Sequence, residues 1–258
     1  MSFPMNSMIS MLLGLIYSSL TEEVYRNIAI EILSSYAQLQ TITQKELAQK
    51  CNVTISTLNK FYASVGCRSY NDFKRHMKDG ENIRRAQIDM RFQKTDEKTM
   101  LDNIRALAKT PFNRSLFVHS VQEYNELAYE APRIIILGGN FSQALTLHYQ
   151  QDMILFGKLV YAYPSVGTIV IPEVNDKTLF VLISQSGNTL GFAKDKIAEL
   201  KSQYHKISVI TGNSSVVKDN SIKNVIRMPI EGEDEVGNTL LVEMLRYMKY
   251  QYHEMYCR

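Results

Sequence analysis

The spacing of apolar residues changes near residue 130, and the kind of element it predicts changes with it. Upstream, apolar positions recur every three or four residues: Ile28, Ile32 and Leu33 share one face of a helix over residues 25–36, and residues 96–109 repeat the pattern. From residue 133 onward, short Ile- and Val-rich runs alternate with helical stretches. The runs are 133–139, 158–163, 177–184, 206–212 and 224–229, and the helical stretches are 142–156, 190–204 and 236–256. This alternation predicts a parallel sheet covered by helices on both faces.

The two patterns divide the 258-residue chain into parts. We predict an all-helical domain over residues 1–78, a charged linker or linker helix over 79–110, and a doubly wound, flavodoxin-like α/β domain of about five strands over 111–258. With 45% hydrophobic and 21% charged residues, the composition is ordinary for a globular protein.

Residues 44–61 have the spacing of a helix-turn-helix. Leu47 and Ala48 face inward from a first helix, and Leu58 and Phe61 point back into the core from a second one. Asn52 stands at the turn, where the backbone needs a left-handed residue and asparagine is the usual substitute for glycine. The sequence therefore predicts a helix-turn-helix, although a plain three-helix core with a polar outer face would show a similar pattern.

The outward face of the second predicted helix suits DNA, because hydroxyls, amides and amines bind phosphates and base edges. Residues 43–78 carry seven Lys and Arg against two acidic residues, whereas residues 111–258 carry 14 basic and 15 acidic ones. A local basic block favours an anionic partner for this part of the chain, and a solvated helical face is the alternative. The predicted DNA-binding residues are Thr54, Ser56, Thr57, Asn59, Lys60, Arg68 and Lys74.

Two predicted strands end in small polar turns that lead into predicted helices. Ligands of doubly wound sheets bind at the carboxyl ends of the strands, where backbone N–H groups and hydroxyls form a cradle for an anion. The predicted ligand-binding residues are Gly138, Ser142, Ser184, Gln185, Ser186, Gly187, Asn188 and Thr189. The alternative is that these Ser and Thr side chains only cap helices. Neither a complete G-x-G-x-x-G nor a G-K-[ST] is present, so no nucleotide cofactor is predicted.

The stretch "ELAQKCNVTISTLNKFYASVGCRSYNDFK", followed by an α/β domain with "SQSGNT", resembles the MurR/RpiR family of bacterial transcriptional regulators. Members join an N-terminal helix-turn-helix to a sugar isomerase (SIS) domain that senses a phosphosugar. The family's Ser-x-Ser-Gly-x-Thr loop matches Ser184, Ser186, Gly187 and Thr189. The resemblance implies operator DNA and a phosphosugar as partners, a homodimer or homotetramer, and no catalytic residue.

The chain departs from the family pattern at two positions of the sugar site. Asn140 stands where a second glycine is usual, and Gly191 stands where a glutamate commonly follows the threonine. One alternative is therefore a regulator whose SIS domain is only a dimerisation scaffold. Another is a phosphosugar isomerase, which needs a general base such as His148, His205 or Glu243.

Other functional classes find little support in the sequence. The apolar segment 8–20 lacks a preceding basic residue and is too short to span a bilayer, so it predicts a packed helix and no membrane association. Three widely spaced cysteines and five scattered histidines predict no disulfide framework and no metal site, and they favour a cytoplasmic location.

Overall fold

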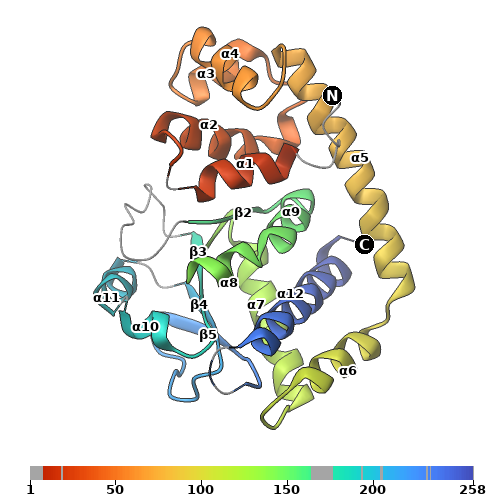
Figure 1. Ribbon diagram of the computed structural model, residues 1–258, viewed down its shortest axis with the longest axis vertical. Coiled ribbons are helices and arrows are strands. Elements are labelled where there is room, and N and C mark those ends of the chain that lie inside the picture. The colour runs from red at the N-terminus through yellow and green to blue at the C-terminus, as the bar shows by residue number, and fades with distance from the viewer. Residues whose placement is uncertain are drawn as a thin grey trace. The chain divides into compact units, whose positions relative to one another are not determined.

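The structure is a computed structural model that describes residues 8–18, 20–163, 177–192, 194–203, 206–230, 232 and 234–257. The chain forms two compact units, Met1–Arg91 and Phe92–Arg258. We describe each unit by itself, because their relative placement is not determined (Figure 1).

The first unit is helical. It contains α1 (Met8–Tyr17), α2 (Glu23–Ser34), the 3-10 turn η2 (Tyr36–Gln38), α3 (Gln44–Lys50), α4 (Ile55–Ser64) and most of α5 (Tyr70–Lys94). The predicted apolar stripe of α2 is correct, because Ile28, Ile32 and Leu33 are all buried. Helix α1 packs against α2 with Leu12 and Ile16 fully buried. Among the described residues, no helix is long and apolar enough to cross a membrane.

The second unit is built on a sheet of five strands, β1 (Arg133–Gly138), β2 (Leu159–Ala162), β3 (Thr178–Ser184), β4 (Ile207–Thr211) and β5 (Ile222–Arg227). All pairs are parallel, in the order β2-β1-β3-β4-β5. This confirms the predicted fold class, a helical N-terminal region followed by a parallel, flavodoxin-like α/β sheet.

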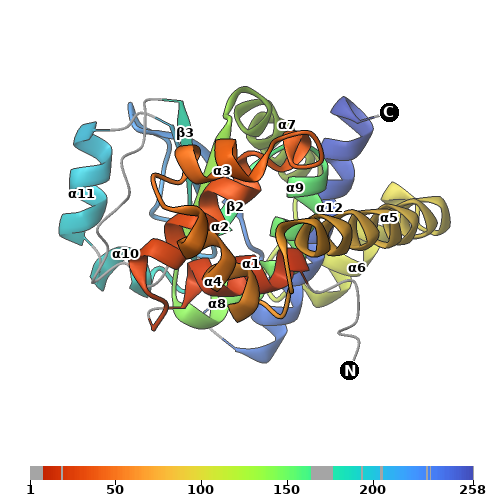
Figure 2. The same ribbon diagram turned by 90° about the horizontal axis from the view of Figure 1, so that it is seen from above.

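Helices cover both faces of this sheet. The helices are α6 (Glu97–Leu107), α7 (Arg114–Glu130), α8 (Asn140–Ala144), α9 (Leu147–Leu155), α10 (Asn188–Phe192), α11 (Lys194–Gln203) and α12 (Glu235–Tyr256). Helices α10 and α11 lie on one side, and α7, α9 and α12 lie on the other (Figures 1 and 2). Strands β1 to β4 are therefore buried on both faces, as their unbroken apolar runs require, whereas the edge strand β5 exposes Lys223.

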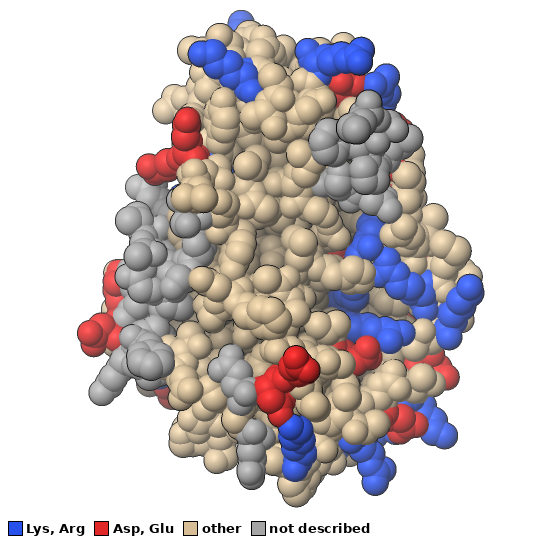
Figure 3. Space-filling model, viewed as in Figure 1, with Lys and Arg blue, Asp and Glu red and all other residues tan. Residues whose placement is uncertain are grey.

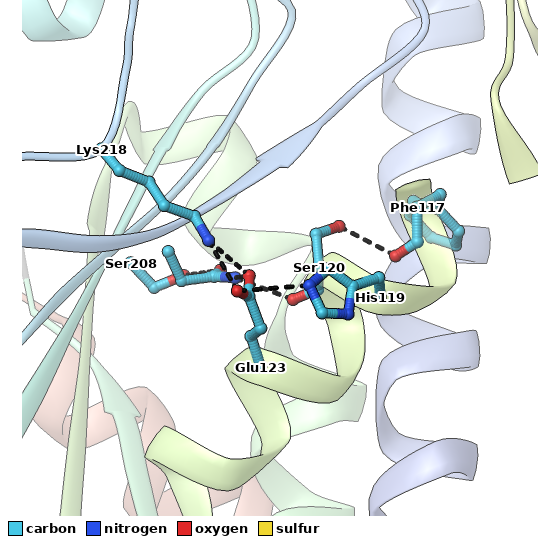
Figure 4. A network of polar contacts seen from close by, with 7 residues as sticks. Phe117, His119, Ser120, Glu123, Ser208 and Lys218 are labelled. Atoms are coloured by element: carbon cyan, nitrogen blue, oxygen red, sulfur yellow. Dashed lines mark hydrogen bonds and ion pairs between the residues drawn. The ribbon is translucent and has the colours of Figure 1, made fainter. Parts of the chain in front are cut away.

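A buried polar network attaches α7 to strands β4 and β5 (Figure 4). The fully buried Asn224 donates to the Ser120 carbonyl at 2.8 Å and accepts from the Ser208 hydroxyl at 2.8 Å. Glu123 accepts from Asn224 at 3.3 Å and pairs with Lys218 at 2.6 Å. Because these buried groups are paired, the network fixes how α7 lies on the sheet.

Two of the predicted helices are interrupted. The stretch 142–156 forms α8 and α9, because the chain turns at Leu145 and Thr146, where the Thr146 hydroxyl donates to the Gln143 carbonyl at 2.6 Å. The stretch 190–204 likewise becomes α10 and α11, with α10 beginning two residues early, at Asn188; Tyr204 lies outside the described residues. Much of the predicted linker is helical, because α5 extends to Lys94.

Candidate functional site

The strand order places a crevice between the carboxyl ends of β1 and β3. Chain direction across the sheet reverses there: β1 leads outward to β2, whereas β3 leads to β4 on the other side. This is the position where ligands bind in doubly wound sheets. The turns after β1 and β3 are the two polar turns predicted from the sequence. In the parallel pairing of β1 and β3, Gly138 lies beside Ile183, so the two turns that follow lie at the same edge of the sheet.

Gln185 connects these turns to a third element. Its amide nitrogen lies 3.5 Å from the Ser142 hydroxyl, at the limit of a hydrogen bond, and donates to the Asn238 side chain at 2.8 Å. Its backbone carbonyl accepts from Gly212 at 2.9 Å. Ser142 and Gln185 are both buried. The predicted residues from β1–α8 and β3–α10 therefore do converge, and the first turn of α12 joins them.

Two buried polar atoms at this edge have no hydrogen-bond partner among the described residues. They are the Ser184 hydroxyl and the Gln185 side-chain carbonyl. Leaving such a group unpaired costs about 1–3 kcal/mol, so each of these atoms calls for an explanation. A hydroxyl and an amide oxygen at this edge have the chemistry to bind a polar ligand.

The predicted glycines have identifiable backbone roles. A side chain at Gly138 would place its Cβ 2.7 Å from the Ile183 carbonyl oxygen, so this glycine permits close approach of β1 to β3. Gly187 has φ +86°, and a side chain there would also collide with Asn213. Both glycines are required for the backbone conformation of the turns. Neither has to contact a ligand to have this role.

The remaining predicted residues form the outer part of the second turn. Ser186 and Thr189 are half-buried and Asn188 is exposed. The Asn188 N–H donates weakly to the Ser186 hydroxyl at 3.4 Å. The Thr189 hydroxyl lies 3.9 Å from where a Cβ on Gly139 would stand, so the two turns face each other at this point.

The start of α12 is a part of the site that sequence reasoning missed. Its N-cap Asp234 accepts from the Gly237 N–H at 2.8 Å and also pairs with Lys109. Gly237 lies against Gln185, since an added Cβ would stand 2.6 Å from the Gln185 side-chain oxygen. The Asp-x-x-Gly-Asn run at 234–238 was the only sequence signal, and it shows a helix start without showing where that helix lies.

The helices that follow the two turns, α8 and α10, are each five residues long. The long helix that begins at this edge is α12, with 22 residues.

Two of the three candidate general bases are among the described residues, and neither stands on either turn. His148, at the start of α9, is 3.7 Å from Asp152, and its ring nitrogen is 2.5 Å from the Lys249 amine. Glu243, in the middle of α12, pairs with Arg246 at 3.4 Å. His205 lies outside the described residues. Neither turn carries a titratable side chain.

A cavity of about 450 Å³ lies beyond this crevice, between the start of α7 and the ends of β4 and β5. Phe112, Phe117 and Val217 give it apolar walls, and Arg227 and Lys218 lie at its polar side. It is lined by none of the predicted ligand-binding residues.

Helices α3 and α4 bury the apolar residues that the sequence predicted to face inward. Leu47, Ala48, Leu58 and Phe61 are buried, as expected. Asn52 has φ 52°, and it is the one non-glycine residue with positive φ in the described part of the chain. These positions confirm the predicted turn and the predicted inward faces.

The predicted DNA-binding side chains lie mostly on the surface, and Lys and Arg side chains are visible there (Figure 3). Thr54 caps α4 by accepting from the Thr57 N–H at 3.1 Å. Asn59 accepts from Gln44 of α3 at 2.7 Å, and Lys74 donates to the Gln40 carbonyl at 3.2 Å. Ser56, Lys60 and Arg68 are all exposed.

No protein-family model and no curated protein matches the chain. Among solved structures, it is similar over 95% of its length to 92% of the Vibrio vulnificus NanR protein complexed with ManNAc-6P, at 15% identity and a TM-score of 0.40. It is also similar, over 62% of its length, to 87% of the sugar isomerase domain of an RpiR transcription factor from Sphaerobacter thermophilus. The identity is 14% and the TM-score is 0.44. A third similar structure is a tagatose-6-phosphate ketose/aldose isomerase from Escherichia coli. The similarity covers 54% of this chain and 40% of the isomerase, at 22% identity and a TM-score of 0.40. Likenesses this low do not decide between regulator and enzyme.

Proposed function

We propose that the chain is a DNA-binding transcriptional regulator of the MurR/RpiR type, whose α/β unit senses a phosphosugar. The observation that carries the proposal is the buried, unpaired Ser184 hydroxyl beside Gln185 at the crevice between β1 and β3. Neutral donors and acceptors there bind a phosphate or sugar hydroxyl without transforming it. Hydrogen bonds to a charged group contribute roughly 1.5–3 kcal/mol each.

The DNA part of the proposal is supported by the α3–α4 arrangement. Exposed Ser56 and Lys60 on α4, with Arg68 just beyond it, supply side chains for base edges and phosphates. A palindromic operator requires two such units, so the proposed regulator acts as a homodimer or homotetramer.

Fluorescence anisotropy with DNA from upstream of the chain's own gene tests the DNA part. We expect sequence-preferring binding below micromolar at moderate salt, altered by a phosphosugar. Lys60→Ala should weaken binding and lower the salt dependence by about one counterion, because one phosphate contact is lost. Lys223→Ala, an exposed lysine on β5, is the control of equal charge. Equal losses in both variants would contradict the assignment of α4.

Thermal unfolding with a phosphosugar panel tests the sensing part. A ligand at 100 to 1,000 times its dissociation constant stabilises the protein by roughly 3–4 kcal/mol. Ser186→Ala should abolish that stabilisation, whereas Ser202→Ala, on the exposed face of α11, should leave it intact. A panel without any shift favours a dimerisation scaffold instead.

One observation supports an isomerase as the second candidate. Glu235 lies one turn before Asn238 on α12, so the two share a helix face, and Asn238 bonds to Gln185. An exposed carboxylate is thus placed near the crevice, where a general base would act. Isomerisation of an aldose or ketose phosphate that disappears in Glu235→Gln would establish the enzyme. No turnover, with binding retained, favours the sensor.

A further inference from the structure

Three potential metal ligands lie together at the junction of α4 and α5 in the first unit. Cys67 lies on the connecting turn, and Asp72 and His76 lie on the first two turns of α5, four residues apart. One ligand atom from each residue lies within 4.8 Å of the others. Sequence analysis predicted no metal site here, because no two of the three residues form a recognised Cys or His spacing.

The imidazole of His76 lies between the other two side chains. Its Nδ1 is 3.5 Å from the Cys67 sulfur, and its Nε2 is 3.9 Å from Asp72 Oδ1. Around tetrahedral zinc, with bonds of about 2.3 Å to sulfur and about 2.0 Å to nitrogen, the sulfur and nitrogen are about 3.5 Å apart. The Cys67–His76 pair therefore already has the separation that a shared zinc ion requires.

The carboxylate adds a third ligand, with one ligand atom of each residue within 4.8 Å of the others; its 3.9 Å approach is to Nε2, the ring nitrogen that does not face Cys67. Asp72 accepts from the Arg68 N–H at 3.0 Å and pairs with Arg75. Thiolate, imidazole and carboxylate are together the ligands of zinc.

The same three residue types also occur in nucleophilic triads, and the geometry disfavours that alternative. Cys67 is 3% exposed, which closes its sulfur to an approaching substrate. The 3.9 Å separation of His76 and Asp72 is also too long for the hydrogen bond that orients a catalytic imidazole.

We propose that Cys67, Asp72 and His76 bind a divalent transition metal, with zinc the best match, at the junction of α4 and α5. Binding displaces the thiol proton to solvent, so that the sulfur bonds to the metal as a thiolate. The side chains of Asp72 and His76 are 16% and 35% exposed, which leaves a path for the ion and a fourth position open to solvent. The metal would join the end of α4 to the start of α5.

A titration of the untagged full chain with Co²⁺ and then Zn²⁺ tests the site. We expect one equivalent of Co²⁺ to give the absorption of a tetrahedral thiolate complex and Zn²⁺ to displace it. Cys67→Ala and the half-exposed His76→Gln should each abolish the absorption. Cys51→Ser, which alters a cysteine outside the cluster, should preserve it.

The outcomes separate cleanly. No thiolate absorption in the unaltered chain, or absorption that survives both Cys67→Ala and His76→Gln, would overturn the proposal. Circular dichroism establishes that each variant is folded, and His76→Gln keeps the test valid if Cys67→Ala unfolds the unit. The titration uses no DNA and no phosphosugar, so its result is independent of the proposed regulatory function.

Discussion

At the scale of single residues, the backbone decides several identities that a list of functional groups would miss. Gly138 is required because a Cβ would meet the Ile183 carbonyl, and Asn52 because its φ is positive. The neighbouring Ser184 differs in kind, because its buried hydroxyl has no partner among the described residues. The first two serve the fold, and the third is available to the proposed ligand.

Replacing Asn52 tests the turn of the helix-turn-helix. Asn52→Ala should destabilise the protein by about 1 kcal/mol, because alanine in the left-handed region costs roughly 1–2 kcal/mol, whereas asparagine tolerates it. Asn52→Gly should leave stability within about 0.5 kcal/mol of the unaltered chain. Urea unfolding followed by circular dichroism measures both. Equal effects of alanine and glycine would contradict the role of φ.

Ser184→Ala should change stability and ligand binding in opposite directions. Removing an unpaired buried hydroxyl should leave the free protein as stable or up to about 1 kcal/mol more stable. Binding of the proposed phosphosugar should weaken, because the ligand loses the hydroxyl that is proposed to bind it. Thermal unfolding with and without ligand measures both quantities in one experiment.

Ser208→Ala is the matched control for that substitution. Its hydroxyl is equally buried but already donates to Asn224 at 2.8 Å. It should therefore destabilise the free protein by about 1 kcal/mol and leave ligand affinity unchanged. If Ser184→Ala behaves like Ser208→Ala, the Ser184 hydroxyl has a structural partner and the ligand assignment is wrong.

At the scale of elements, a buried ion pair joins α9 and α12. The Lys249 amine lies 2.5 Å from Asp152, and both side chains are almost fully buried. The pair holds together two helices on one face of the sheet. Since α12 also carries Asn238 to Gln185, the pair helps to position one wall of the proposed ligand site.

Lys249→Met should destabilise the protein by about 3–5 kcal/mol, because it leaves the Asp152 carboxylate buried without its main partner. Replacing both residues, as Asp152→Leu with Lys249→Met, should recover most of that loss, since no charge remains buried. Lys201→Met is the control, because its pair with Asp219 is exposed and should contribute less than about 1 kcal/mol. Urea unfolding of the four chains distinguishes these values.

Some of these elements could be predicted from the sequence, and others could not. The strands were predictable, because each is a short Ile- and Val-rich run bounded by polar residues, and the two turns could be placed at one edge by the rule for parallel sheets. The break between α8 and α9 was not, because Thr146 ends the helix through its own hydroxyl. The contact of Asn238 with Gln185 spans 53 residues, and no local pattern encodes it.

At the scale of the whole molecule, one helix joins the two units. Helix α5 begins beside the helix-turn-helix at Tyr70 and ends at Lys94 in the second unit. There Phe92 contacts two residues of α12, Tyr250 at 5.3 Å and His253 at 4.9 Å between ring centroids. Because α12 starts at the proposed ligand site, we expect these rings to carry a change at its N-terminus to α5.

Phe92→Ala should therefore weaken the coupling between phosphosugar and DNA. We expect the phosphosugar to change operator affinity in the unaltered chain by a factor corresponding to about 1–3 kcal/mol, the usual range for allosteric coupling. In Phe92→Ala that factor should approach one, while the affinity for each ligand alone stays within about threefold. Anisotropy titrations of DNA with and without saturating phosphosugar measure the coupling.

Met90→Ala provides the control, since Met90 lies two residues away on α5 and is 52% exposed. It shortens a side chain of the same helix without touching the aromatic contact, so its coupling should equal that of the unaltered chain. If both variants couple normally, the signal does not pass through Phe92. If both lose coupling, the integrity of α5 matters and the ring contact does not.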